Sequence, residues 1–198
     1  STTEAQEKVA LQVAEQISDY LKTGAITNAV NTFSLTASEY NTVQPYLKLS
    51  EQLGGFAGQL TENAIKKITV EFEGVISKIN TQPLIQTIIC FLLKKNFDGV
   101  NIINSVSVAK TKSIQITTIK HENAGEYQSS VTLTIETEKQ TRSVSGTLFG
   151  GKPRIVNVKG IKIEAELSKY NLYISNEDKP GFISCLLYTS PSPRDTRR

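Results

Sequence analysis

The chain has 198 residues and a formal net charge of +3, but three arginines and one aspartate among the last five residues account for +2 of that charge. Residues 1–184 therefore carry about +1, too little to indicate a nucleic-acid partner. Two cysteines exclude a disulfide scaffold and favour a reducing, cytoplasmic compartment. The longest apolar run, Leu84–Leu93, is about half the roughly twenty residues of a membrane span, so we expect no membrane partner.

The first expected element is an amphipathic helix over Ser1–Leu21. Ser1 and Glu4 have the spacing of a capping box, and Gly24 supplies a left-handed stop. Apolar residues share one face of this helix: Val9, Val13, Ile17, Tyr20 and Leu21. A polar, aperiodic stretch follows and offers no immediate partner for that face. We therefore expect the helix to close a domain and the stretch after it to be a linker.

A second helix is expected over Val43–Leu60, with Pro45 in its first turn. Gly54, Gly55 and Gly58 either weaken this helix locally or allow another backbone to approach it closely.

Alternation of apolar and polar residues predicts a series of strands after this helix. The predicted elements are the strands Ile65–Glu73, Ile114–Ile119, Ser130–Glu138, Arg142–Phe149, Arg154–Val158 and Ile161–Leu167, with a buried helix over Pro83–Lys94. Turns at Lys139-Gln140 and Lys159-Gly160 make hairpins of the last four strands. The predicted fold class is α+β, with helices followed by an antiparallel sheet.

The sequence predicts no catalytic, cofactor-binding or metal-binding residue. Gly146–Lys152 has the spacing of a phosphate-binding loop, but Pro153 replaces the Ser or Thr that would bind magnesium, and a strand follows where a helix should begin. We expect a glycine-rich turn between strands. The single histidine, His121, lies in a polar turn without an evident orienting partner, and no dinucleotide fingerprint is present.

Two segments could bind a small ligand. In the first, Lys152 and Arg154 come close to Lys159 and Lys162 through a strand, a turn and a second strand. These cations either hold an anion, such as a phosphorylated metabolite, or form a solvated basic edge that discourages aggregation.

The second segment is Asn171–Gly181, where a short strand over Leu172–Ile174 is expected to lead into a loop. Gly181 allows a close approach, and a helix beginning after it would present N–H groups to a carboxylate. Asn176 and Asp178 could then bind an amino group or a polar head. An ordinary β-turn is the alternative.

Three segments in a fixed order, Ser1–Gly24, Ser143–Val158 and Asn171–Ile183, resemble the C-terminal part of D-3-phosphoglycerate dehydrogenase in its long, ACT-containing form. Thr3–Ala10 resembles the helix that follows the catalytic histidine loop of that family. The resemblance implies that the catalytic arginine, glutamate and histidine, and the domain that binds NAD, lie upstream of Ser1.

The resemblance also implies a domain plan. The helix 1–24 would end the catalytic unit, residues 25–40 would be a linker, and residues 41–168 would be the intervening α+β domain. Residues 169–184 would begin a truncated ACT domain, and the tail 185–198 (CLLYTSPSPRDTRR) looks like a translated sequencing adaptor.

Site residues carried over from the family fall in the same two segments. The intervening domain binds anionic, substrate-like ligands in some members. Arg154 stands where those members have a basic residue, and Glu166 stands where some have arginine. Asn176 and Asp178 occupy the ACT-loop positions that contact the effector serine.

The implied activity of the parent protein is oxidation of 3-phosphoglycerate to 3-phosphohydroxypyruvate with NAD, in serine biosynthesis, by a cytoplasmic homo-oligomer. The piece present here would carry regulatory and assembly regions and would be inactive alone. Two alternatives stay open: a stand-alone regulatory module that binds an amino acid or a phosphorylated acid, and a structural domain that joins subunits.

Overall fold

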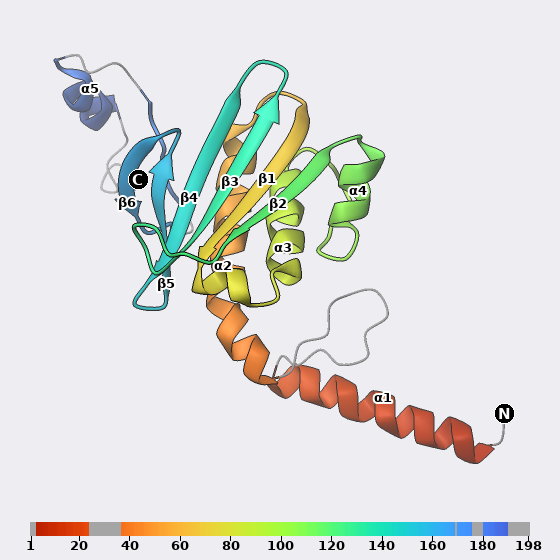
Figure 1. Cartoon of the computed structure of the whole chain (residues 1–198). Coiled ribbons are helices and arrows are strands. Elements are labelled where there is room, and N and C mark those ends of the chain that lie inside the picture. The colour runs from red at the N-terminus through yellow and green to blue at the C-terminus, as the bar shows by residue number, and fades with distance from the viewer. Residues whose placement is uncertain (1–2, 24–36, 169, 176–179, 190–198) are drawn as a thin grey trace, which may run out of the picture. The chain divides into compact units, whose positions relative to one another are not determined.

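The structure is a computed structural model that describes residues 3–23, 37–168, 170–175 and 180–189. The chain divides into two compact units, Ser1–Leu167 and Ser168–Arg198, and each is described by itself. The larger unit contains the sheet and the helices that pack on it (Figure 1).

Helix α1 (Thr3–Thr23) forms where the amphipathic pattern predicted a helix. Glu4 in its first turn and Lys22 in its last complement the helix dipole. No described residue of α1 is buried, and the predicted apolar stripe is exposed, from 47% at Val13 to 77% at Leu21. The predicted cap Ser1 and stop Gly24 lie outside the described residues.

Helix α2 (Ala37–Leu60) begins ahead of the predicted start at Val43. Pro45 therefore lies inside the helix, and its predicted place in the first turn was wrong. A proline in this position removes one backbone hydrogen bond and favours a kink, and α2 changes direction along its length in Figure 1. Val43, two residues before the proline, is only 2% exposed and belongs to the hydrophobic core.

Six strands form one sheet in the order β2-β1-β3-β4-β5-β6. The strands are β1 (Ile65–Gly74), β2 (Gln115–His121), β3 (Ser129–Thr137), β4 (Thr141–Phe149), β5 (Lys152–Val158) and β6 (Ile161–Ala165). Both predicted hairpins are confirmed. The β5–β6 turn has positive φ at Lys159 (53°) and Gly160 (82°), as a two-residue hairpin turn requires.

The α+β class is confirmed, but one strand pair departs from the predicted antiparallel pattern. Strands β1 and β2 are parallel, whereas the other neighbouring pairs are antiparallel. The reason lies in the connection between them, because a crossover through helices returns the chain in the same direction. That crossover contains η1 (Val75–Lys78), the predicted buried helix α3 (Gln82–Leu93) and the short helix α4 (Ser105–Thr111), which the sequence pattern missed.

Helices α2 and α3 cover one face of the sheet, and the hydrophobic core lies between the two layers (Figure 1). Strand β1 contributes Ile68, Val70 and Phe72, each fully buried, as its alternation predicted. The helices contribute fully buried side chains as well: Leu49, Leu53, Leu84, Ile88, Ile89, Leu92 and Leu93.

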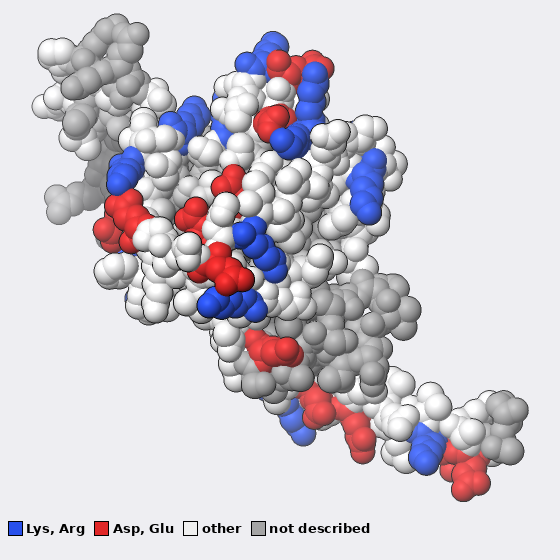
Figure 2. Space-filling view, viewed as in Figure 1, with Lys and Arg blue, Asp and Glu red and all other residues white. Residues whose placement is uncertain are grey.

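The opposite face of the sheet carries no helix and is turned toward the viewer in Figure 2. Its side chains are mainly polar, and they bind one another across neighbouring strands. Ser130 donates to Glu73 (3.0 Å) and Thr132 donates to Ser145 (2.9 Å). Figure 2 shows both signs of charge scattered over this face, so no single-sign patch forms there.

In the smaller unit, helix α5 (Phe182–Thr189) begins directly after Gly181, whose φ is +90°. Most of α5 lies in the segment 185–198 that the sequence analysis set apart as adaptor-like, so this helix does not test the resemblance to an ACT domain. The predicted strand over Leu172–Ile174 does not form. A strand is stabilised by hydrogen bonds to a neighbouring strand. An alternating pattern of three residues does not by itself provide such a neighbouring strand.

Candidate anion-binding cleft

The glycine-rich segment singled out by the sequence is the turn between β4 and β5. Gly150 (φ 56°) and Gly151 (φ 78°) take left-handed conformations, and Lys152 begins β5 directly after them. The predicted turn between strands is confirmed, because a strand follows where a phosphate-binding loop would open a helix. The turn lies beside the first half of α2 and faces it across a cleft.

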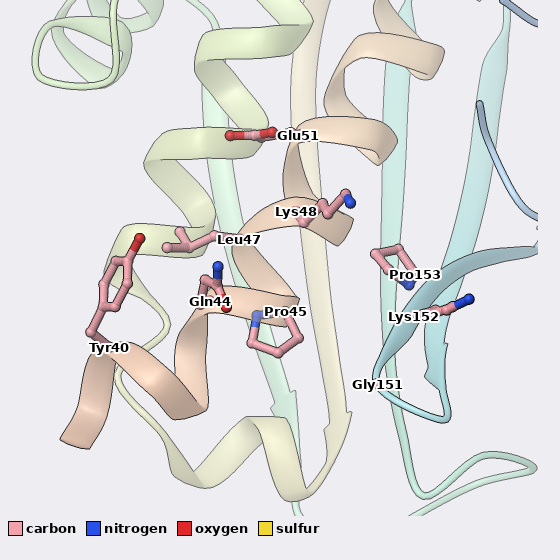
Figure 3. Close-up of a pocket in the computed structure, with 9 residues that line it drawn as sticks. All are labelled: Tyr40, Gln44, Pro45, Leu47, Lys48, Glu51, Gly151, Lys152 and Pro153. Atoms are coloured by element: carbon pink, nitrogen blue, oxygen red, sulfur yellow. The ribbon is translucent and has the colours of Figure 1, made fainter. Parts of the chain in front are cut away.

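Helix α2 supplies the other wall of this cleft. Tyr40, Gln44, Leu47 and Glu51 recur at intervals of three and four residues, so they lie along one side of the helix. Pro45 and Lys48 occupy the adjoining side, nearer to β5, as Figure 3 shows.

The cleft has a volume of about 480 Å³, within the size range of small-molecule sites. In Figure 3 Lys48 extends from α2 toward Pro153, and Lys152 extends outward from the start of β5. We name this hollow, with its walls on α2 and on Gly151–Pro153, the α2–turn cleft.

Lys48 and Lys152 differ from four other cations of the same unit. Lys66, Lys67, Arg154 and Lys162 each lie within 4.0 Å of a carboxylate. Neither Lys48 nor Lys152 makes such an ion pair with a described residue. Their positive charge is thus not cancelled by a direct carboxylate contact within the described part of the chain.

Glu51 is the one carboxylate that lines the α2–turn cleft among the described residues. Although its side chain reaches solvent, the surrounding protein raises the pKa of its carboxyl group by desolvation, and Lys48 lowers it by a smaller amount. Burial likewise raises the pKa of the Cys90 thiol on α3, with Lys94 opposing and Glu51 adding to that rise. Burial therefore makes ionisation of the Glu51 carboxyl group less favourable than it is in water.

Arg154, the other predicted anion-binding residue, is held by two carboxylates of the chain. Its guanidinium lies 3.7 Å from Glu164 and 3.5 Å from Glu166, and its side chain is 27% exposed. An anion would have to compete with both carboxylates to reach it. One of these two carboxylates belongs to Glu166.

The remaining cations of the predicted basic segment do not join Lys152 in the cleft. Lys162 binds Glu126 through both carboxylate oxygens (2.8 and 2.9 Å), and this hydrogen bond raises the pKa of the lysine. Lys159 lies in the β5–β6 turn. Lys162 and Glu126 border a second, smaller hollow of about 160 Å³ on the open face of the sheet, and Ser130, Thr132 and Ser145 also line it.

The predicted effector residues Asn176 and Asp178 lie outside the described residues. His121 ends β2 and is exposed. Within the described ranges, no cluster of His, Cys, Asp and Glu side chains could hold a metal ion. Among those same residues, no helix has both the length and the apolar character needed to cross a membrane.

Sequence reasoning found Lys152 but missed Lys48, Glu51, Tyr40 and Gln44. The spacing along α2 shows that some of these side chains share a side of the helix. It does not show that this side borders the β4–β5 turn, which lies about a hundred residues later.

Comparison with known proteins identifies the domain. Residues 42–159 match the D-3-phosphoglycerate dehydrogenase intervening domain. The chain is 35% identical over 186 residues to a D-3-phosphoglycerate dehydrogenase of Synechocystis sp., and the match covers 92% of this chain and 34% of that protein. The Bacillus subtilis and Archaeoglobus fulgidus proteins of the same name are 27% and 28% identical, each with 92% of this chain and 35% of the relative covered.

The chain thus spans about a third of the length of these curated relatives. The family match extends from early α2 to the β5–β6 turn and includes both walls of the α2–turn cleft apart from Tyr40. On this evidence, the chain belongs to the family of the D-3-phosphoglycerate dehydrogenase intervening domain.

Proposed function

We propose that this chain is the regulatory and assembly region of an NAD-dependent D-3-phosphoglycerate dehydrogenase. The match of residues 42–159 to the intervening domain is the observation that carries this proposal. The intact enzyme would oxidise 3-phosphoglycerate to 3-phosphohydroxypyruvate in serine biosynthesis. Its catalytic residues and its NAD site would lie in the remaining two thirds of the protein.

The exposed apolar side of α1 supports the proposal that the catalytic unit is a separate part of the protein. A helix whose apolar residues are all exposed gains little from standing alone, because most helical stability in proteins comes from packing. We propose that α1 completes the catalytic unit by burying Val9, Val13 and Ile17 against it. The larger unit would then hold the ligand-binding and subunit-joining surfaces of a cytoplasmic homo-oligomer.

Lys152 and Arg154 remain the proposed anion-binding residues of the intervening domain. Lys152 is the better candidate for binding an anion, because its charge is accessible. The guanidinium of Arg154 already pairs with two carboxylates, those of Glu164 and Glu166. For the segment that resembles an ACT domain, we propose that Asn176 and Asp178 contact serine in the intact protein.

A chimera tests the proposal. This chain would replace the matching third of the Synechocystis relative, and NADH formation from 3-phosphoglycerate would be followed by absorbance. We expect the chimera to be active and oligomeric and the isolated chain to produce no NADH. Activity of the isolated chain, or a folded chimera without activity, would contradict the proposal.

The second candidate function is a stand-alone regulatory module that binds an amino acid or a phosphorylated acid. The α2–turn cleft favours it, because ligand binding there needs no other part of the enzyme. Calorimetry of the isolated chain with serine and with 3-phosphoglycerate tests this candidate. Absence of heat with both ligands would remove it.

A further inference from the structure

We propose that residues 122–128, which connect β2 to β3, form a lid over the open face of the sheet, held closed by the Glu126–Lys162 ion pair. We name this segment the strap and the ion pair the latch. The closed strap covers the hollow of about 160 Å³ on that face, and its opening admits small molecules to the side chains beneath. This inference concerns access to the face and does not depend on the activity proposed above.

The strap is longer than the connection between its two strands requires. Strand β2 ends at His121, which pairs with Glu73 of β1. Strand β3 begins at Ser129, which pairs with the next residue of β1, Gly74. Two strand spacings, about 10 Å, therefore separate the ends that must be joined, and about three extended residues span that distance. Seven residues are present, and their trace passes across neighbouring strands before it returns to β3 (Figure 1).

The contacts of the strap place it over the open face. Glu126 accepts hydrogen bonds from Lys162 of β6 through both carboxylate oxygens (2.8 and 2.9 Å), and β6 is the edge strand farthest from β2. The preceding residue, Gly125, lies above β1, since a Cβ atom added there would be 3.3 Å from a carboxylate oxygen of Glu73. The strap therefore lies across the sheet and does not project from its end.

Strap and sheet together line the smaller hollow. Glu126 and Tyr127 come from the strap, whereas Thr132, Ser145 and Asn157 come from β3, β4 and β5. Thr132 donates a hydrogen bond to Ser145 (2.9 Å), so these two hydroxyl groups bind each other across the floor of the hollow. Movement of the strap therefore uncovers the floor without breaking this bond.

Few interactions hold the strap in its closed position. Its residues are exposed except Tyr127, which is half-buried. Within the described residues, its backbone accepts one hydrogen bond, which Val75 donates to the carbonyl oxygen of Gln128 next to β3 (3.3 Å). The latch is also exposed, by 58% at the Glu126 side chain and 74% at the Lys162 side chain. An exposed ion pair of this kind is weak and is screened by salt, so the strap can open locally while the sheet stays folded.

Cysteine labelling beneath the strap tests the lid. The labelled position is Ser145→Cys in a chain that also carries Cys185→Ser, because Cys185 is exposed and Cys90 is buried. The probe is iodoacetamide, which is uncharged, and the measured quantity is the rate at which the new thiol is alkylated. Adding Glu126→Gln or Lys162→Gln should raise this rate by up to about fivefold. Sodium chloride at about 0.5 M should have the same effect on the chain with an intact latch.

The two latch variants separate opening of the strap from a change in thiol reactivity. Removing the carboxylate of Glu126 favours the reactive thiolate, whereas removing the ammonium group of Lys162 disfavours it. Faster alkylation in both variants therefore reports opening. The double variant should react no faster than the faster single variant, because the two substitutions break one contact.

The matched control is Ser143→Cys, which lies on the same strand and the same face but outside the hollow. Its alkylation rate should not respond to the latch variants. Equal acceleration at both positions, opposite effects of Glu126→Gln and Lys162→Gln, or a rate at Ser145→Cys that neither salt nor the variants change would each overturn the lid. Thr132→Cys, in the same hollow, repeats the measurement if Ser145→Cys fails to fold.

Discussion

Gly54 of α2 lies directly against the backbone carbonyl oxygen of Ile88 on α3, with no room for a side chain between them. Gly58, one turn later, has the same relationship to Leu92, whose carbonyl oxygen would lie 2.7 Å from an added Cβ atom. Both contacts involve backbone atoms, which cannot turn aside as a side chain can. The two glycines therefore set how closely α2 and α3 approach each other.

We predict that Gly54→Ala lowers the free energy of unfolding by about 1 to 3 kcal/mol, because the added methyl group must push two packed helices apart. Denaturant titration of the purified chain measures the change. Gly55→Ala is the matched control, since no atom lies within 4 Å of a Cβ added there. The free energy of unfolding of Gly55→Ala should rise by up to about 1 kcal/mol, because alanine has a higher helix propensity than glycine. Equal effects at both positions would contradict the packing argument.

A second prediction concerns the effect of Glu51 on the pH dependence of the free energy of unfolding. Its pKa in the folded chain lies above the ordinary value of 4.5, chiefly through desolvation. The folded state therefore favours the protonated form, and this contribution to stability is lost as pH rises from 4.5 through the higher folded pKa. Glu51→Gln should be more stable than the native chain at pH 7 and no more stable at pH 3.5.

Thermal unfolding of both proteins across that pH range checks the sign. The groups that interact with the Glu51 carboxylate are Lys48 on its own helix and the Cys90 thiol on α3, whose pKa is itself raised by burial. Glu62→Gln is the control, since it removes a carboxylate from the loop after α2. A stability difference at Glu51 that grows as the pH falls would refute the assignment.

A third prediction separates Arg154 from Lys152 as an anion contact. Replacing Glu164 and Glu166 together by glutamine removes the two carboxylates that hold the Arg154 guanidinium. The double variant should gain a phosphate-binding site on the sheet face, detected by calorimetry and abolished by adding Arg154→Gln. If the added site survived without Arg154, a different residue would have to supply the charge.

A fourth prediction tests whether α1 stabilises the chain. Val13 is 47% exposed and Leu53 is fully buried. Val13→Ala should change the free energy of unfolding by no more than about 0.5 kcal/mol, whereas Leu53→Ala should lower it by about 2 to 5 kcal/mol through lost burial and a cavity. Denaturant titrations of the two variants give the comparison. A large decrease in the free energy of unfolding of Val13→Ala would show that α1 packs within this chain.

In the chimeric enzyme the same helix should behave differently. Val13→Asp there should lower thermal stability and activity together, because the proposed docking of α1 would bury a charge. An unaffected chimera would mean that α1 packs on nothing in the catalytic unit.

The sequence by itself determined the elements whose patterns are local. Alternation in Ile65–Glu73 and the turn residues Lys159 and Gly160 specified a strand and a hairpin, because side-chain period and left-handed φ depend on the chain within a few residues. The three glycines of α2 left open either a local weakening of the helix or a close backbone contact, and the structure shows that Gly54 and Gly58 provide such a contact while Gly55 does not.

Only the tertiary structure decided which distant residues meet. The parallel β1–β2 pair depends on a crossover that brings two strands about forty residues apart into one register. The cleft depends on the packing of α2 beside the β4–β5 turn, which places Lys48 and Lys152 on opposite walls of one hollow. Arg154 instead pairs with Glu164 and Glu166. Such neighbours follow from how apolar surfaces are buried over the whole domain, and burial is shared among residues that no local pattern connects.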